Sequence, residues 1–229
     1  MSNITQVASV RQVMHTSAGE GLAAGLTSAM AAIGAAPATR RGVTLLPREA
    51  FMGVREWHLG GVGYGSDEVA VRIVHHPFAA TEGLDLIHVA ATVPGTRPAA
   101  ADRIIAASLA LLAVRLGLLS RVLDLAVTHL SERQAEGSPL IGKQLLQGAV
   151  ADVVTVIEAG RHCLDLLGAA ATPPRSALDL MHQRVGTAGW QLITMFGASG
   201  YLREHPVRCL YVADLIAACW AAGPSLDLE

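Results

Sequence analysis

The longest apolar stretch of the chain, residues 97–136, predicts a single long helix. Leucine, isoleucine and valine recur along it at steps of three and four residues, and other apolar residues fill much of the remaining circumference. A helix that is apolar nearly all round is buried either in a large core or in a membrane. Arg115, Arg121 and Asp124 interrupt the apolar run before it reaches the ~20 residues that a bilayer span needs. The pattern therefore favours the central helix of a bundle.

Three more helices are expected after this one. Helical periodicity continues in three segments, at residues 140–167, 176–196 and 206–222. Ser176 is placed to cap the second of these segments. Prolines and glycines separate the segments and the connections are short, which is typical of an up-down four-helix bundle. We place this bundle at residues 97–223, followed by a tail at 224–229.

The first 96 residues follow other patterns. Residues 1–42 are rich in alanine and glycine, and Ser17 with Glu20 forms a capping-box pattern that would start a helix; the structure and role of this segment stay open. From residue 43 onward polar and apolar residues alternate in short runs, which predicts strands. The expected strands are residues 43–46, 68–75 and 84–93. The sequence thus predicts a mainly α fold, a four-helix bundle with a small β-rich N-terminal appendage at residues 43–96.

Composition limits the classes of function. Hydrophobic residues make up 52% of the 229 residues and charged residues only 16%, which predicts a buried subunit interface in a homodimer or larger oligomer. A formal charge of −2 with scattered basic residues gives no electrostatic footprint for nucleic acid. The three cysteines lack the spacing of a metal site, and no signal-peptide pattern follows Met1. We therefore expect a cytoplasmic protein without a metal site.

Two groups of residues near the ends of the predicted helices resemble a known family. The first group comprises Arg133-Gln134, Gly137-Ser138-Pro139-Leu140, Gln144 and Ala151-Asp152. The second group is Phe196-Gly197-Ala198-Ser199-Gly200-Tyr201. In this order and spacing they resemble the C-terminal domain of the acyl-CoA dehydrogenases, which typically shows Arg-x-Phe-Gly-x-Pro-Leu and Gly-Gly-x-Gly-Tyr there. The resemblance covers residues 43–223.

The resemblance implies an FAD site at these residues. In the family, an arginine and a glutamine at the positions of Arg133 and Gln144 lie near the diphosphate and adenine end of the flavin, across a subunit boundary. A guanidinium offers several fixed donors to phosphate oxygens. The turn that contains Gly197 and Gly200, preceded by Thr194, would let backbone N–H groups approach a phosphate closely.

The resemblance also implies a substrate pocket in the β-rich region. The segment Gly63-Tyr64-Gly65-Ser66 is similar to a glycine-rich segment that lies, in the family, beside the flavin ring and the substrate. Ser66 is therefore a candidate residue of that pocket. A plain hairpin with a glycine-rich turn would explain the same residues.

Several positions depart from the family pattern. The phenylalanine that stacks on adenine is replaced by Ala135-Glu136, and a carboxylate beside phosphates opposes binding. The second glycine of the turn is Ala198. Where many members carry a catalytic glutamate, and related monooxygenases a histidine, this chain has Ala221, which cannot transfer a proton. Asp124 and Glu132 are the only carboxylates near the place that some members use instead, so the catalytic base stays unknown.

Two hypotheses follow from these observations. The family has a helical domain and a full β-domain ahead of the bundle, whereas about forty residues precede the β-rich region here. The chain would be an oxidoreductase component that acts on an acyl thioester or related small molecule and completes its flavin site with a full-length relative or a second copy of itself. Alternatively, it would be a non-redox enzyme such as a cyclase, or a structural partner subunit, that has lost FAD. For the isolated chain we expect weak FAD binding or none.

Overall fold

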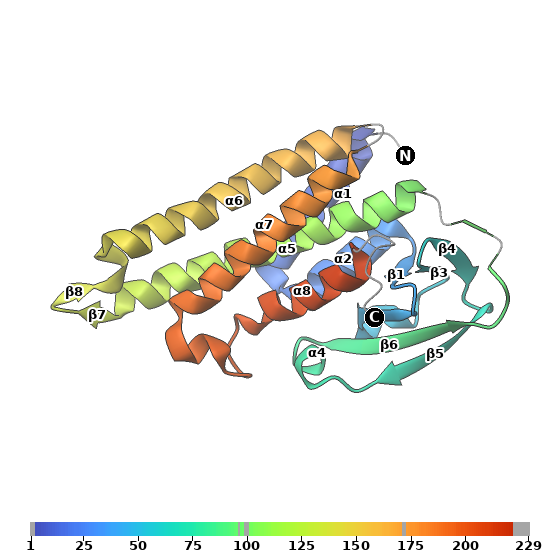
Figure 1. Cartoon of the computed structure of the whole chain (residues 1–229), viewed down its shortest axis with the longest axis horizontal. Coiled ribbons are helices and arrows are strands. Elements are labelled where there is room, and N and C mark those ends of the chain that lie inside the picture. The colour runs from blue at the N-terminus through green and yellow to red at the C-terminus, as the bar shows by residue number, and fades with distance from the viewer. Residues whose placement is uncertain (1–2, 96, 99–100, 171–172, 222–229) are drawn as a thin grey trace.

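The computed structural model describes residues 3–95, 97–98, 101–170 and 173–221, with helices along most of its length and two small sheets at one end (Figure 1). The α-helices are α1 Asn3–Glu20, α2 Leu22–Ile33, α3 Arg48–Phe51, α4 Pro77–Thr81, α5 Ala101–Glu132, α6 Gln144–Ala169, α7 Arg175–Met195 and α8 Arg208–Trp220. Two 3₁₀ helices are η1 Leu140–Gly142 and η2 Gly197–Tyr201. The strands are β1 Ala36–Ala38, β2 Val43–Pro47, β3 Glu56–Leu59, β4 Val62–Gly65, β5 Val69–Val74, β6 Leu84–Ala91, β7 Gln134–Ala135 and β8 Ser138–Pro139.

Helix α5 is the centre of the molecule, as the sequence predicted. It contacts α1, α2, α6, α7 and α8. By length and composition α5 could cross a bilayer, but 72% of its most apolar window is buried inside the protein. Among the largest fully buried side chains, half come from this helix: Leu109, Leu111, Leu112, Leu116, Leu118 and Leu119. The apolar surface of α5 is thus accounted for by the bundle core.

The N-terminal segment belongs to the same packed unit, because α1 and α2 lie along α5. The predicted helix start at Ser17 is wrong, since this residue lies inside α1 and the two helices break at Gly21, where φ is 96°. The Ser17 hydroxyl donates instead to the Val114 carbonyl of α5 at 2.8 Å. Beside this bond, a Cβ at Gly117 would come within 2.3 Å of the Met14 carbonyl. A small residue on α5 therefore lets α1 approach it closely.

The four-helix bundle of α5 to α8 is confirmed, with shifted ends. Helix α5 begins at Ala101 rather than near residue 97, and α8 has 13 residues and is shorter than expected. Ser176 does not cap α7, because that helix starts at Arg175 after Pro174 and has no side-chain cap. The tail at residues 224–229 lies outside the described residues.

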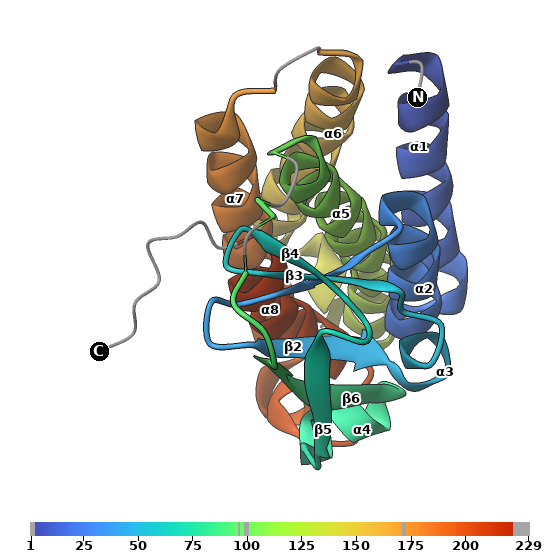
Figure 2. The same ribbon diagram turned by 90° about the vertical axis from the view of Figure 1, so that its right-hand side faces the viewer.

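The three predicted strands form one antiparallel sheet in the order β2-β6-β5. A second sheet has the order β1-β3-β4, in which β1 and β3 are parallel. In Figure 2, which looks at this end of the molecule, both sheets lie in front of the helix ends. Two contacts hold the first sheet to α8: Trp220 Nε1 donates to Thr44 Oγ1 at 3.1 Å, and Arg208 pairs with Glu82 at 2.9 Å. The β-rich appendage is therefore packed against the bundle.

Candidate functional site

The end of the bundle farthest from the sheets carries the first group of family residues. After α5 the chain makes the hairpin β7–β8, which lies at the left end of Figure 1. Its two turn residues, Glu136 and Gly137, have φ of 55° and 78°, as a two-residue primed turn requires. This hairpin was not predicted, because glutamate is rare at a position with positive φ.

Arg133 and Gln144 are both exposed at this end. The hairpin fixes the backbone of Arg133, whose N–H donates to His129 O and whose carbonyl accepts from Leu140 N at 2.8 Å. Among the described residues its guanidinium has no hydrogen bond or ion pair. The Glu136 carboxylate, which we expected to oppose a bound phosphate, pairs with Lys143 Nζ at 2.7 Å. The arginine is thus free for a ligand, and the nearby negative charge is partly neutralised.

The second group of family residues follows the end of α7. Gly197 is exposed with φ of 59°, and a Cβ at Gly200 would lie 2.5 Å from the Ile193 carbonyl, so a larger residue would displace the turn. Thr194 is exposed, and its hydroxyl donates to Gln191 O at 2.7 Å. The turn is therefore a tight structure in which Gly200 is buried and Gly197 is exposed on the outer side.

A cluster of rings joins the two groups. His129, in the last turns of α5, lies with its ring centroid 5.0 Å from that of Phe196, and His205 packs on the same Phe196 at 4.8 Å. Burial, together with the charge of His129, lowers the pKa of His205. His129 is one helical turn from Arg133, and Phe196 directly precedes Gly197. The cluster therefore places the two groups at one end of the bundle, a proximity that the sequence order alone could not reveal.

Ser66, the candidate for a substrate pocket, lies at the opposite end. It is exposed, and its amide donates to Arg55 O at 3.1 Å. The adjacent Glu56 pairs with Arg103 at the start of α5. The distance along the axis of α5 from Arg103 to the other end of the helix is roughly 45 Å, at 1.5 Å per residue. Within one chain, Ser66 is thus not brought together with the residues around Arg133 (Figure 1).

The expected position of a base provides none. Ala221 is buried, and Asp124 and Glu132 are exposed on α5. On α8, the carboxylate nearest in sequence to Ala221 is that of Asp214.

Asp214 belongs to a network inside the bundle. It pairs with the buried Arg115 of α5. Arg115 Nη1 also donates to His182 Nδ1 and to the His182 carbonyl, both at 3.0 Å, and His182 Nε2 bonds the Ser108 carbonyl at 3.1 Å. Burial, and then the charge of Arg115, lower the pKa of His182 to about 3. Burial raises the pKa of Asp214 against the effect of Arg115. The network is a satisfied link between three helices.

Comparison with known proteins identifies the family. A family model described as "Acyl-CoA dehydrogenase, C-terminal domain" matches residues 99–225, more than half of the chain. The chain belongs to the acyl-CoA dehydrogenase family. The resemblance seen in the sequence is thereby confirmed, as is the fold class. A search of curated protein sequences gave no match.

Solved structures of acyl-CoA dehydrogenases share the fold. Butyryl-CoA dehydrogenase from Megasphaera elsdenii is 16% identical, with a TM-score of 0.57; the match covers 86% of this chain and 62% of that one. A Tcur3481-Tcur3483 steroid ACAD variant is 21% identical, with a TM-score of 0.58, and the match covers 85% and 61%. A glutaryl-CoA dehydrogenase from Mycobacterium smegmatis in complex with FADH2 is 12% identical, with a TM-score of 0.54, over 81% and 52%. The chain thus spans between half and two thirds of the length of these relatives.

Proposed function

We propose that this acyl-CoA dehydrogenase family member is a component of a flavin oxidoreductase that acts on an acyl thioester or related small molecule, with its flavin site shared between subunits. One observation carries the proposal: the 5.0 Å contact between His129 and Phe196 brings the Arg133 group and the Gly197 turn to the same exposed end of the bundle. Both groups resemble phosphate-binding elements of the family. Their proximity supports a single binding site.

The residues at this end fit the diphosphate end of FAD. Arg133, which has no side-chain partner in the described part of the chain, would bind phosphate oxygens through its guanidinium. Gln144 would add an amide at the start of α6. Gly197 presents a backbone without a side chain, where a Cβ would meet no other atom within 4 Å, so a ligand could approach it. When bound, FAD would supply redox chemistry. The role of this chain there is to hold and orient the cofactor.

The ring end of the cofactor requires a second chain. Ser66, whose counterpart in the family lies beside the ring, is a full length of α5 away from Arg133. We propose that another copy of this chain, or a full-length relative, provides the residues around the ring. Large apolar side chains on the outer faces of α6 and α7 support such an assembly. They are Leu145 at 90% exposure, Leu166 at 73%, Leu180 at 52% and Trp190 at 45%.

A second candidate function rests on the missing base. Since Ala221 stands where relatives carry a proton-transfer group, the chain alone would lack dehydrogenase activity; losing a positioned base typically costs 10²–10⁴-fold in rate. A non-redox enzyme on the same bundle, or a structural subunit beside an active partner, fits this observation.

Flavin retention separates the two candidates. The chain is purified alone and after co-expression with a full-length relative encoded nearby, and visible absorption is measured after gel filtration. We expect little flavin in the isolated chain and stoichiometric flavin in the complex. Arg133→Ala should weaken FAD binding by about 10–100-fold, the value of a charge-assisted hydrogen bond. Arg184→Ala, which removes another exposed arginine on α7, is the matched control. Equal retention by both variants would contradict the role of Arg133, and a colourless complex would favour the non-redox candidate.

A further inference from the structure

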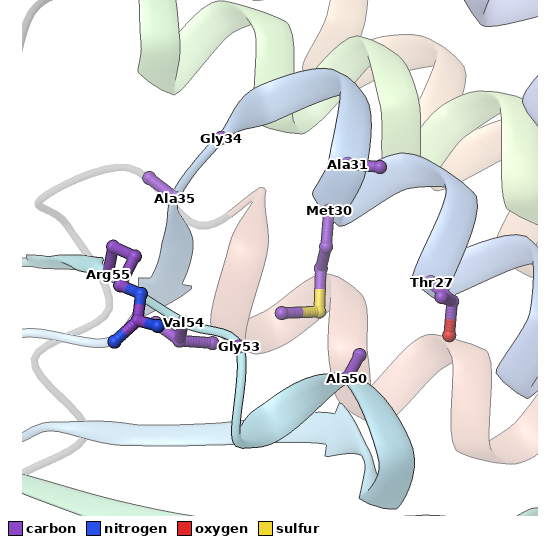
Figure 3. A pocket seen from close by; sticks show the side chains of 9 residues that line it. All are labelled: Thr27, Met30, Ala31, Gly34, Ala35, Ala50, Gly53, Val54 and Arg55. Carbon is purple, nitrogen blue, oxygen red and sulfur yellow. The ribbon is translucent and has the colours of Figure 1, made fainter.

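A hollow of about 390 Å³ lies between α2 and the segment that runs from α3 to β3 (Figure 3). The hollow is distant from Arg133. One of its lining residues, Arg55, accepts the backbone hydrogen bond from Ser66 described above. The residues that line it come from two segments. They are Thr27, Met30, Ala31, Gly34, Ala35, Ala50, Gly53, Val54 and Arg55.

The lining is apolar except for Arg55 at one edge and Thr27 at the other, whose hydroxyl donates to Ala23 O at 2.9 Å. Met30 extends from α2 across the hollow toward Gly53 and Val54 (Figure 3). The remaining lining residues are mostly alanine and glycine, whose small size leaves the space open. The volume lies in the range of sites for small molecules, which typically combine an apolar lining with a few placed polar groups. Met30 can adapt to the shape of a ligand, because its thioether side chain has several rotatable bonds.

Arg55 supplies the polar group at the edge. Its backbone is fixed by the 3.1 Å bond from Ser66 N, but its guanidinium makes no hydrogen bond or ion pair with any residue in the described part of the chain. Three other arginines near the two sheets are paired, whereas Arg40, Arg41 and Arg72 form no ion pair among the described residues. Arg48 pairs with Asp85, Arg97 with Glu68, and Arg103 with Glu56. Of the arginines without an ion pair among the described residues, Arg55 is the one that lines the hollow.

We propose that this hollow binds a linear carboxylate of medium chain length. Its hydrocarbon chain lies against Met30 and Val54, and its carboxylate forms a forked pair with Arg55. The apolar walls favour a hydrocarbon body, since burial removes it from water. The charge of Arg55 selects an anion, and the planar guanidinium matches a carboxylate with two parallel hydrogen bonds. This site is separate from the Arg133 end of the proposed flavin site, although Arg55 contacts Ser66, the candidate residue at the ring end.

The first test separates the charge from the chain. Binding of octanoate and of octanol to the full chain is measured by calorimetry or by NMR shifts of the Met30 methyl group. We expect saturable octanoate binding that Arg55→Gln weakens at least tenfold, and weaker octanol binding that Arg55→Gln leaves unchanged. Arg41→Gln, at an exposed arginine in the turn before β2, should change neither. An equal effect of Arg55→Gln on both ligands, or no saturable octanoate binding at millimolar concentration, would overturn the proposal.

The second test fills the hollow. A Cβ at Gly53 meets nothing nearer than the Ala50 carbonyl at 3.5 Å, and the backbone there does not have a positive φ, so Gly53→Leu can be accommodated. We expect this variant to keep its melting temperature and to lose octanoate binding. Gly19→Leu, at an exposed glycine on α1 with open space around it, is the control and should bind as the unmodified chain does. Undiminished binding by a folded Gly53→Leu protein would show that octanoate binds elsewhere.

Discussion

The middle of the bundle and its outer end use similar side chains in opposite ways. In the middle, Arg115 and His182 are buried and their polar atoms have partners. At the outer end, Arg133 has no partner among the described residues, and His129 and His205 contact the ring of Phe196 in tilted and edge-on arrangements while partly exposed. The difference shows that a polar residue in this protein serves the fold when its donors are used, and is free for a ligand when they are not.

The strongest test of this contrast compares the two arginines. Arg115→Met should lower the free energy of unfolding by about 3 kcal/mol, because it leaves His182 Nδ1 and Asp214 without their buried partner. Arg133→Met should change it by less than about 0.5 kcal/mol. Urea unfolding at one protein concentration measures both. Similar losses in the two variants would mean that Arg133 also has a structural role.

The histidines sharpen the contrast through pH. The pKa of His182 is about 3 in the folded protein and about 6.5 when unfolded, so between these values the unfolded chain binds the additional proton. Stability should therefore fall as pH decreases below about 6.5, by up to ~1.4 kcal/mol per pH unit from this residue. His182→Gln should flatten the dependence. His205→Gln, at a partly exposed residue whose pKa is also lowered, should flatten it much less. Parallel curves for the unmodified chain and His182→Gln would refute this.

The smallest expected effect concerns the hairpin at the outer end. Glu136 adopts φ of 55°, where asparagine is favoured in a two-residue turn before glycine. Glu136→Asn should raise the free energy of unfolding by about 0.5 kcal/mol, because its left-handed conformation costs less. Glu136→Gln removes the same charge without relieving the backbone, so it should give no gain. Thermal unfolding of the two variants side by side would show the difference, and an equal gain would attribute it to charge.

The sequence predicted what depends on local periodicity. Helix α5 and the strands β2, β5 and β6 were found in this way, because burial of one face leaves a repeat that a short window can show. The helix α1 was missed, since its many small and polar residues hide the pattern and it is positioned by contact with Gly117 of α5. The local hydrophobic pattern indicates which face of a helix or strand is buried, but not which other element packs against that face.

The candidate site was predictable only in part. Arg133 and Gly197 were identified by resemblance, but their proximity depends on the contact of His129 with Phe196, 67 positions later in the chain. Arg115 was interpreted only as an interruption of an apolar helix. Its partners, His182 and Asp214, are on two other helices. Such contacts depend on tertiary packing, for which a single sequence carries no signal.

The central place of α5 also determines how the molecule opens. Every other long helix packs on its 32 residues, so no group of helices can separate without exposing part of it. Backbone amides around Leu112 to Leu119 should therefore exchange with deuterium only when the whole chain unfolds, whereas those of the hairpin around Glu136 should exchange through small local openings. Amide exchange rates measured along α5 would then show where local opening near the exposed end gives way to global unfolding in the core.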